Sequence, residues 1–221
     1  MFLKYAYIVF IGLAFITSLA ALYRASERPA HLRLFSVLLG LTFVVECFAA
    51  LLFKPLHWGS NVPLYNSFML VEFMAYAWYY HMILKTGWAR QLARLFLFLF
   101  PPFWAWVVFW VFGILHWNSY VVVAGSVFTI FVSAAYYYEI FTRQADINLL
   151  DTPEFWIATG LLIFYACNLP YIGMLNYLVK NYMPLAKTFL VILKILNILM
   201  YSIFTYAFIC RIPIKKSSSS S

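Results

Sequence analysis

Glu72 lies in the middle of an apolar stretch, residues 64–81 ("LYNSFMLVEFMAYAWYYH"), that is close to the length needed to cross a bilayer. A carboxylate at that depth has no water to solvate it, and charges inside spans generally face the bundle interior and belong to a site. A helical projection at about 100° per residue places Tyr65, Tyr76 and Tyr79 on the same face as Glu72. The spacing predicts a polar helix face that carries a buried carboxylate.

Two further charges lie in other apolar stretches: Glu46 in "VVECF" and Lys194 in "LVILKILNILM". At roughly 1.5 Å per residue, these two charges and Glu72 all lie about 10–14 Å below the same membrane surface. Several polar residues fall at a similar depth or on the same helix faces. We therefore predict one pocket for a ligand or ion, formed by Glu46, Glu72, Lys194, Asn168, Asn197, Tyr65, Tyr76, Ser126 and Thr129.

Two carboxylates against one ammonium leave an excess negative charge in the predicted pocket. One glutamate must then be protonated, share a proton or meet a cation, which favours a functional site. The alternative is a structural network in which Lys194 pairs with the carboxylates and pins three helices together, helped by Asn and Tyr hydrogen bonds. In both cases we expect Lys194 to lie within ion-pair or water-bridged reach of Glu72 or Glu46.

Other chemistry has little support in the sequence. The four histidines are scattered over separate segments without HxxxH or HExxH spacing, so no metal site is predicted. No nucleophile motif, phosphate-binding loop or paired aspartates occur, so we expect no enzyme activity and no catalytic residues. The net charge of +8 forms no continuous basic face, which argues against a nucleic-acid partner.

Composition sets the class of the protein. Of its 221 residues, 66% are hydrophobic and only 10% are charged, and the mean hydropathy is +0.88, so an all-α polytopic membrane protein is predicted. Residues 1–211 form one bundle of seven transmembrane helices, and residues 212–221 a disordered cytoplasmic tail. The expected spans are residues 3–23, 33–53, 64–84, 94–115, 119–141, 155–178 and 185–210.

Lysine and arginine residues flank the spans unevenly. The richer side holds Arg24, Arg28, Arg33, Lys85, Arg90, Arg94, Arg143, Arg211, Lys215 and Lys216, and the poorer side holds Lys4, Lys54, Lys180 and Lys187. The positive-inside rule then places the N-terminus outside and the C-terminus inside. A cleaved signal peptide at the N-terminus is the competing interpretation, but it would leave Arg24, Arg28 and Arg33 outside.

The segments "PEFWIATGLLIFYACNLPYIGMLNYL", "LVILKILNILMYSIFTYAFIC" and "YNSFMLVEFMAYAWYY" resemble a group of uncharacterised bacterial seven-span membrane proteins. Members of that group are often encoded beside sensor histidine kinases. The resemblance implies a location in the inner (cytoplasmic) membrane of a bacterium. It also implies a sensory role and a signalling partner such as a histidine kinase, besides the lipid bilayer itself. It supplies no functional residue.

The sequence is compatible with three functions. The first is a sensor that binds a small ligand in the pocket and signals to a separate cytoplasmic partner, without a cofactor. The second is a proton- or cation-coupled transporter, favoured by the carboxylate excess and by helix kinks at Pro101, Pro102 and Pro170. The third is a photoreceptor with retinal on Lys194 as a Schiff base and Glu72 as its counter-ion.

Overall fold

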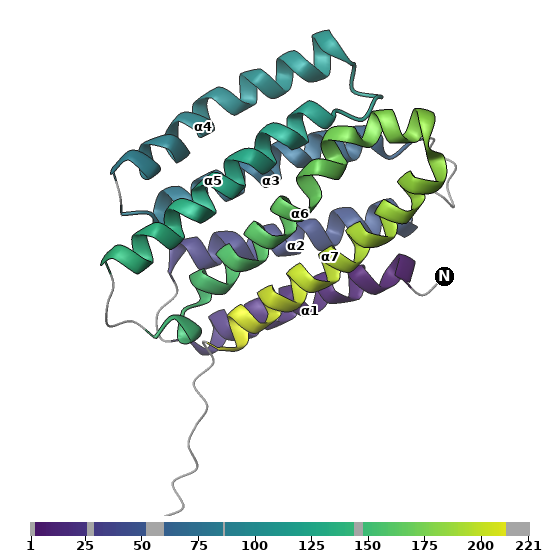
Figure 1. Cartoon of the computed structure of the whole chain (residues 1–221). Helices are drawn as coiled ribbons and strands as arrows, with labels where there is room; N and C mark the ends of the chain where they lie inside the picture. Colours follow the sequence, from purple (N-terminus) through teal and green to yellow (C-terminus); the bar gives the residue numbers. More distant parts are fainter. Residues whose placement is uncertain (1–2, 26–28, 52–59, 86, 144–147, 211–221) are drawn as a thin grey trace, which may run out of the picture.

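The computed structural model describes residues 3–25, 29–51, 60–85, 87–143 and 148–210, and every element in them is helical. A π-helix, η1 (Val107–Val111), continues α4, and a short 3₁₀ helix, η2 (Leu149–Asp151), precedes α6. The long helices are α1 (Leu3–Arg24), α2 (Ala30–Leu51), α3 (Val62–Ile83), α4 (Gly87–Trp106), α5 (Ser119–Arg143), α6 (Pro153–Asn181) and α7 (Met183–Ile209), shown in Figure 1. The predicted tail lies outside the described residues.

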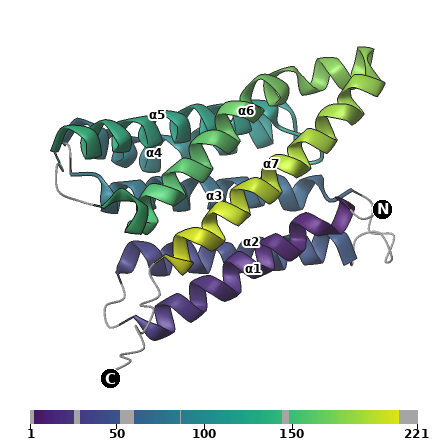
Figure 2. The ribbon, with the colours of Figure 1, turned by 60° about the horizontal axis from the view of Figure 1, so that its bottom comes forward.

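Successive long helices run in opposite directions, so the bundle has two ends (Figures 1 and 2). The end at which α1 begins is called here the N-terminal end, and α3, α5 and α7 also begin there. The opposite, C-terminal end is where α7 finishes. Residues that are far apart in the sequence thus come to the same level of the bundle.

Six of the long helices form a closed ring. The neighbours in order are α1, α2, α3, α5, α6 and α7, and α7 packs back against α1. Helix α4 lies outside this ring, on α3 and α5, as Figure 1 shows. Its outer face exposes large apolar side chains such as Phe98, Leu99 and Trp106, which is the pattern expected of a helix in contact with lipid.

The prediction of a helical, multi-pass membrane bundle is confirmed, but the predicted number of seven spans is not. Six helices in the described part of the chain are long and apolar enough to cross a membrane: α1, α2, α4 with η1, α5, α6 and α7. Helix α3 is not among them, because its 22 residues include Asn66, Glu72 and His81 besides several tyrosines. A seventh span therefore stays a prediction.

Helix α3 carries several fully enclosed side chains, although it alone among the described long helices falls below the apolarity of a membrane span. The side chains of Phe73, Ala77, Tyr79 and Tyr80 have no exposed surface. At Gly125 of α5 an added Cβ would lie 2.5 Å from the Phe73 ring, so only glycine allows α5 to approach α3 this closely. This close packing fixes the face of α3 that carries Glu72.

Proline residues interrupt two helices, as expected. Pro101 and Pro102 lie inside α4, which changes into η1 one turn later. Pro170 lies inside α6, whose ribbon bends in its second half (Figures 1 and 2). A proline within a helix removes one backbone hydrogen bond and crowds the preceding turn, which accounts for a local change of direction.

Candidate ligand pocket

The ring of helices encloses a cavity of about 600 Å³ in the half of the bundle towards the N-terminal end. All six ring helices contribute to its wall, whereas α4 does not. It is lined by Tyr7, Thr42, Glu46, Asn61, Tyr65, Phe68, Met69, Glu72, Phe73, Trp117, Val122, Phe164, Tyr165, Tyr171, Ile172, Leu175, Leu190, Leu193, Lys194, Asn197, Met200 and Tyr201. Its volume is within the usual range of small-molecule sites.

Glu46 of α2 is held by tyrosines from the two neighbouring helices. Its Oε2 accepts a hydrogen bond from the hydroxyl of Tyr7 in α1 at 2.7 Å and one from Tyr65 in α3 at 3.0 Å. Hydrogen bonds to a charged acceptor are among the stronger ones in proteins. A single carboxylate oxygen thus connects α1, α2 and α3.

Glu72 of α3 has a similar arrangement. Its Oε1 accepts a hydrogen bond from Tyr76, one helical turn further along, at 2.9 Å. The hydroxyl of Tyr165 in α6 donates to the same oxygen at 3.4 Å. Glu72 therefore connects α3 to α6, which is not its neighbour in the ring.

Only one oxygen of each carboxylate is used in this way. In the described part of the chain, Oε1 of Glu46 and Oε2 of Glu72 accept no hydrogen bond, and neither is among the polar atoms that are buried without a partner. Because both residues line the cavity, these two oxygens face it. They are available to an ammonium group, a proton donor or water.

Lys194 of α7 lines the same cavity and is half-buried, but the direct ion pair with a carboxylate is not formed. Among the side chains that the structure describes, an ion pair joins Nε2 of His31 to Oε1 of Glu154 at 2.5 Å, near the C-terminal end. Tyrosine hydroxyls rather than the lysine bond to the two carboxylates. A water-bridged contact of Lys194 stays a prediction.

The other predicted site residues have different positions. Tyr65 and Asn197 line the cavity, and Tyr76 lies behind Glu72 and holds it. Ser126 and Thr129 lie outside the lining, since their hydroxyls donate to the carbonyls of Val122 and Gly125 within α5. Asn168 is also outside the lining, buried, with an unpartnered Nδ2.

Asn66 fixes one rim of the cavity. Its Nδ2 donates to the carbonyls of Ile114 and His116, each at 2.8 Å, in the connection between η1 and α5. The next residue in that connection is Trp117, which lines the cavity. Neither Asn66 nor Trp117 was identified as a site residue from the sequence, because an Asn or Trp near a span end is ordinarily an interfacial residue.

Tyr7 and Tyr165 hold the carboxylates and were also not found from the sequence. The chain has 17 tyrosines, so residue type alone does not select the two that reach a carboxylate. Their depth in the membrane could have identified them, since each occurs in a span at a level similar to that of Glu46 or Glu72.

Aromatic rings close the cavity towards the C-terminal end. Tyr76 and Tyr165 pack with ring centroids 6.0 Å apart, and Tyr201 packs on Phe204 at 5.7 Å. Phe204 in turn contacts Phe35 edge to face at 5.0 Å. The polar cavity and the C-terminal end are separated by a packed aromatic layer.

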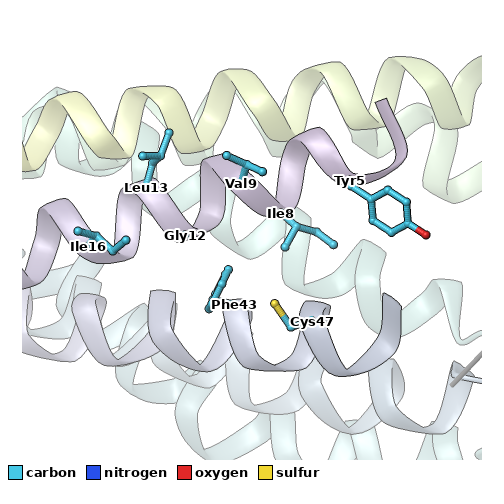
Figure 3. A pocket seen from close by; sticks show the side chains of 8 residues that line it. All are labelled: Tyr5, Ile8, Val9, Gly12, Leu13, Ile16, Phe43 and Cys47. Atoms are coloured by element: carbon cyan, nitrogen blue, oxygen red, sulfur yellow. The ribbon is translucent and has the colours of Figure 1, made fainter. Parts of the chain in front are cut away.

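A second hollow lies between α1 and α2 and is lined by apolar side chains, with the phenol of Tyr5 at one end and Cys47 beside Phe43 (Figure 3). Its volume is about 360 Å³. It carries no charged group and opens away from the ring, so it offers no polar chemistry. The described residues also include no group of three or more His, Cys, Asp or Glu side chains that could hold a metal ion.

No family model, characterised protein or solved structure matches the chain. The chemistry of the cavity is therefore interpreted from its own residues.

Tyr65→Phe tests whether the tyrosines hold Glu46. Loss of the hydroxyl removes one of two charge-assisted hydrogen bonds, and we expect the free energy of unfolding in detergent to fall by about 1–3 kcal/mol. The matched control is Tyr120→Phe, whose side chain is exposed and for which a change below about 0.5 kcal/mol is expected. In a Glu46→Gln background the cost of Tyr65→Phe should shrink. An equal effect of both tyrosine substitutions would show that Tyr65 does not hold the carboxylate.

Proposed function

We propose that the chain is a membrane-embedded sensor module that binds a small polar ligand in the cavity and signals to a separate cytoplasmic partner. The observation that carries this proposal is a single cavity into which two carboxylates and one ammonium, from three different helices, are gathered without pairing directly with each other. A structural network would bring opposite charges together. Charges left open inside a membrane bundle are costly, and a ligand is the usual reason for them.

In this proposal α3 is the seventh span and the N-terminal end of the bundle faces outward. Arg24, Arg33 and Lys85 lie near helix ends at the C-terminal end, where the positive-inside rule favours basic residues. The two neighbours of α3 in the ring, α2 and α5, both meet the length and apolarity of a span. A cavity in the outer half is then reached from outside the cell.

Helices α6 and α7 are the elements best placed to report ligand binding. Together they supply half of the cavity lining. Pro170 weakens α6 at that level, and the far end of α7 packs through Phe204 and Phe208 against Phe35 at the C-terminal end. A ligand that draws α7 towards α2 and α3 would shift these cytoplasmic contacts. A histidine kinase or another membrane signalling protein is the partner that the sensory role requires.

A proton- or cation-coupled transporter is the alternative, and the open carboxylate oxygens favour it. Carboxylates that face a cavity within the membrane are the groups that carry protons or bind cations in such proteins. The bend in α6 would then serve alternating access rather than signalling. The two functions differ in whether the bound species crosses the membrane.

Single cysteines at Asn61 and Lys85, in a protein without other cysteines, test the seventh span. These residues flank α3 at opposite ends. We expect a membrane-impermeant thiol reagent to label Asn61→Cys on intact cells and Lys85→Cys only after permeabilisation. Labelling of both from the same side would show that α3 does not cross the membrane, and labelling of Lys85→Cys alone would reverse the orientation.

Binding to the purified protein in lipid nanodiscs tests the sensor function. A panel of small amines, carboxylates, zwitterions and neutral compounds is screened by thermal unfolding, and at least one compound should raise the melting temperature of the wild type. That compound should alter hydrogen exchange in the last turns of α7. It should fail to stabilise Glu72→Gln but still stabilise Asp151→Asn, which removes an exposed carboxylate far from the cavity.

Two results would contradict the proposal. A panel in which no compound of any class stabilises the wild type would show that the cavity is not a ligand site. Accumulation of the stabilising compound in proteoliposomes under an ion gradient would assign the chain to the transporters instead.

A further inference from the structure

We propose that the ligand of this cavity is a small zwitterion with an apolar part, whose ammonium lies at Glu46 and Glu72 and whose anionic group lies at Lys194. This inference rests on the proposed function and specifies the ligand class. Its starting point is that groups of both signs line one cavity and that no ion pair joins them.

The ammonium subsite consists of carboxylates that are already oriented. Tyrosine hydroxyls hold one oxygen each of Glu46 and Glu72, and the other oxygen of each faces the cavity. A primary ammonium has three donors and no acceptor, so it can donate to both free oxygens and to water. The carboxylates need no rearrangement for this, which favours binding.

The anionic subsite is centred on Lys194. A lysine has a four-carbon stem and readily reaches a nearby carboxylate, yet its ammonium makes no ion pair within the described residues. Its Nζ makes no hydrogen bond to those residues either and is not among the polar atoms buried without a partner, so its three hydrogens are open to an anionic group.

The remaining wall is apolar, and it sets the size and nature of the rest of the ligand. Phe68, Met69, Phe164 and Leu175 lie in the lining besides the polar groups. A volume of about 600 Å³ accommodates a molecule of the size of an aromatic amino acid together with water. A simple metal cation would make no contact with these apolar side chains, and a polyanion would be repelled by the two carboxylates.

This ligand chemistry has two natural sources. One is a free amino-acid-like solute that enters from water, and the other is a phosphatidylethanolamine headgroup that enters from the bilayer. Both carry a primary ammonium and an anionic group. Nanodiscs made with and without phosphatidylethanolamine distinguish them.

The test uses three probes that share one aromatic ring: phenylalanine carries both charges, phenethylamine only the ammonium and 3-phenylpropionate only the carboxylate. Affinity is measured in nanodiscs of phosphatidylglycerol and phosphatidylcholine. We expect phenylalanine to bind wild type at least about tenfold more tightly than either single-charge probe, since each charged contact contributes separately. In discs that contain phosphatidylethanolamine, a lipid source would show as weaker apparent binding of phenylalanine through competition.

Matched lysine variants on α7 assign the anionic subsite. Lys194→Met should abolish the tighter binding of phenylalanine relative to phenethylamine. Lys187→Met replaces an exposed lysine two turns earlier on α7 and should leave that difference in affinity unchanged. Glu72→Gln should act on the other charge of the ligand: it should weaken the binding of phenethylamine more than the binding of 3-phenylpropionate. Melting temperatures of the unliganded variants confirm that each is folded.

Several outcomes would overturn the inference. These are equal affinity of phenethylamine and phenylalanine for the wild type, an equal effect of Lys194→Met and Lys187→Met, and failure of both phenylalanine and phosphatidylethanolamine to bind. If a compound of another class binds in the wider panel, only the zwitterion inference fails. The sensor function itself fails only when no class binds.

Discussion

The structure depends on one constraint: Glu46 and Glu72 cannot face hydrocarbon. A charge at the centre of a bilayer costs at least about 2.5–3.5 kcal/mol when it has no polar surroundings. Both carboxylates therefore have to face the interior of the bundle, and the six ring helices close around them with tightly packed aromatic side chains. Helix α4 carries no acidic group and can lie outside the ring with its apolar face exposed.

Each carboxylate is stabilised by tyrosine hydroxyls rather than by the lysine. Hydroxyl donors satisfy an oxygen without neutralising its charge, so the site keeps a net attraction for a cation. The same arrangement leaves Lys194 unpaired in the opposite wall. The cavity thus presents two kinds of charge at fixed positions, which a direct ion pair would have removed.

Helical periodicity and depth in the membrane were enough to predict that Glu46, Glu72, Lys194, Asn197 and Tyr65 share one cavity. These two quantities give the level of a residue and its direction on a helix. They do not say which helices are neighbours, so they could not decide whether Lys194 pairs directly with a carboxylate. Neighbours are fixed by side-chain packing, such as the contact of Phe73 with Gly125, which no periodicity in a single sequence reveals.

Ser126 and Thr129 show a related limit. Both lie near the predicted level, but each hydroxyl bonds to a carbonyl of its own helix, the usual alternative for Ser and Thr in a span. The number of long helices was predictable from apolar length. The position of α4 outside the ring was not, because its composition resembles that of the ring helices.

Thiol reactivity of two positions in the spans tests the central claim that the charged residues line a water-filled cavity rather than a packed core. In one single-cysteine protein the thiol replaces Asn197 and faces the cavity, and in the other it is the native Cys167, exposed on the outside of α6. In lipid nanodiscs a charged, water-soluble thiol reagent should modify Asn197→Cys rapidly and leave Cys167 unmodified, because only the cavity holds water. Equal resistance of both thiols would contradict the account.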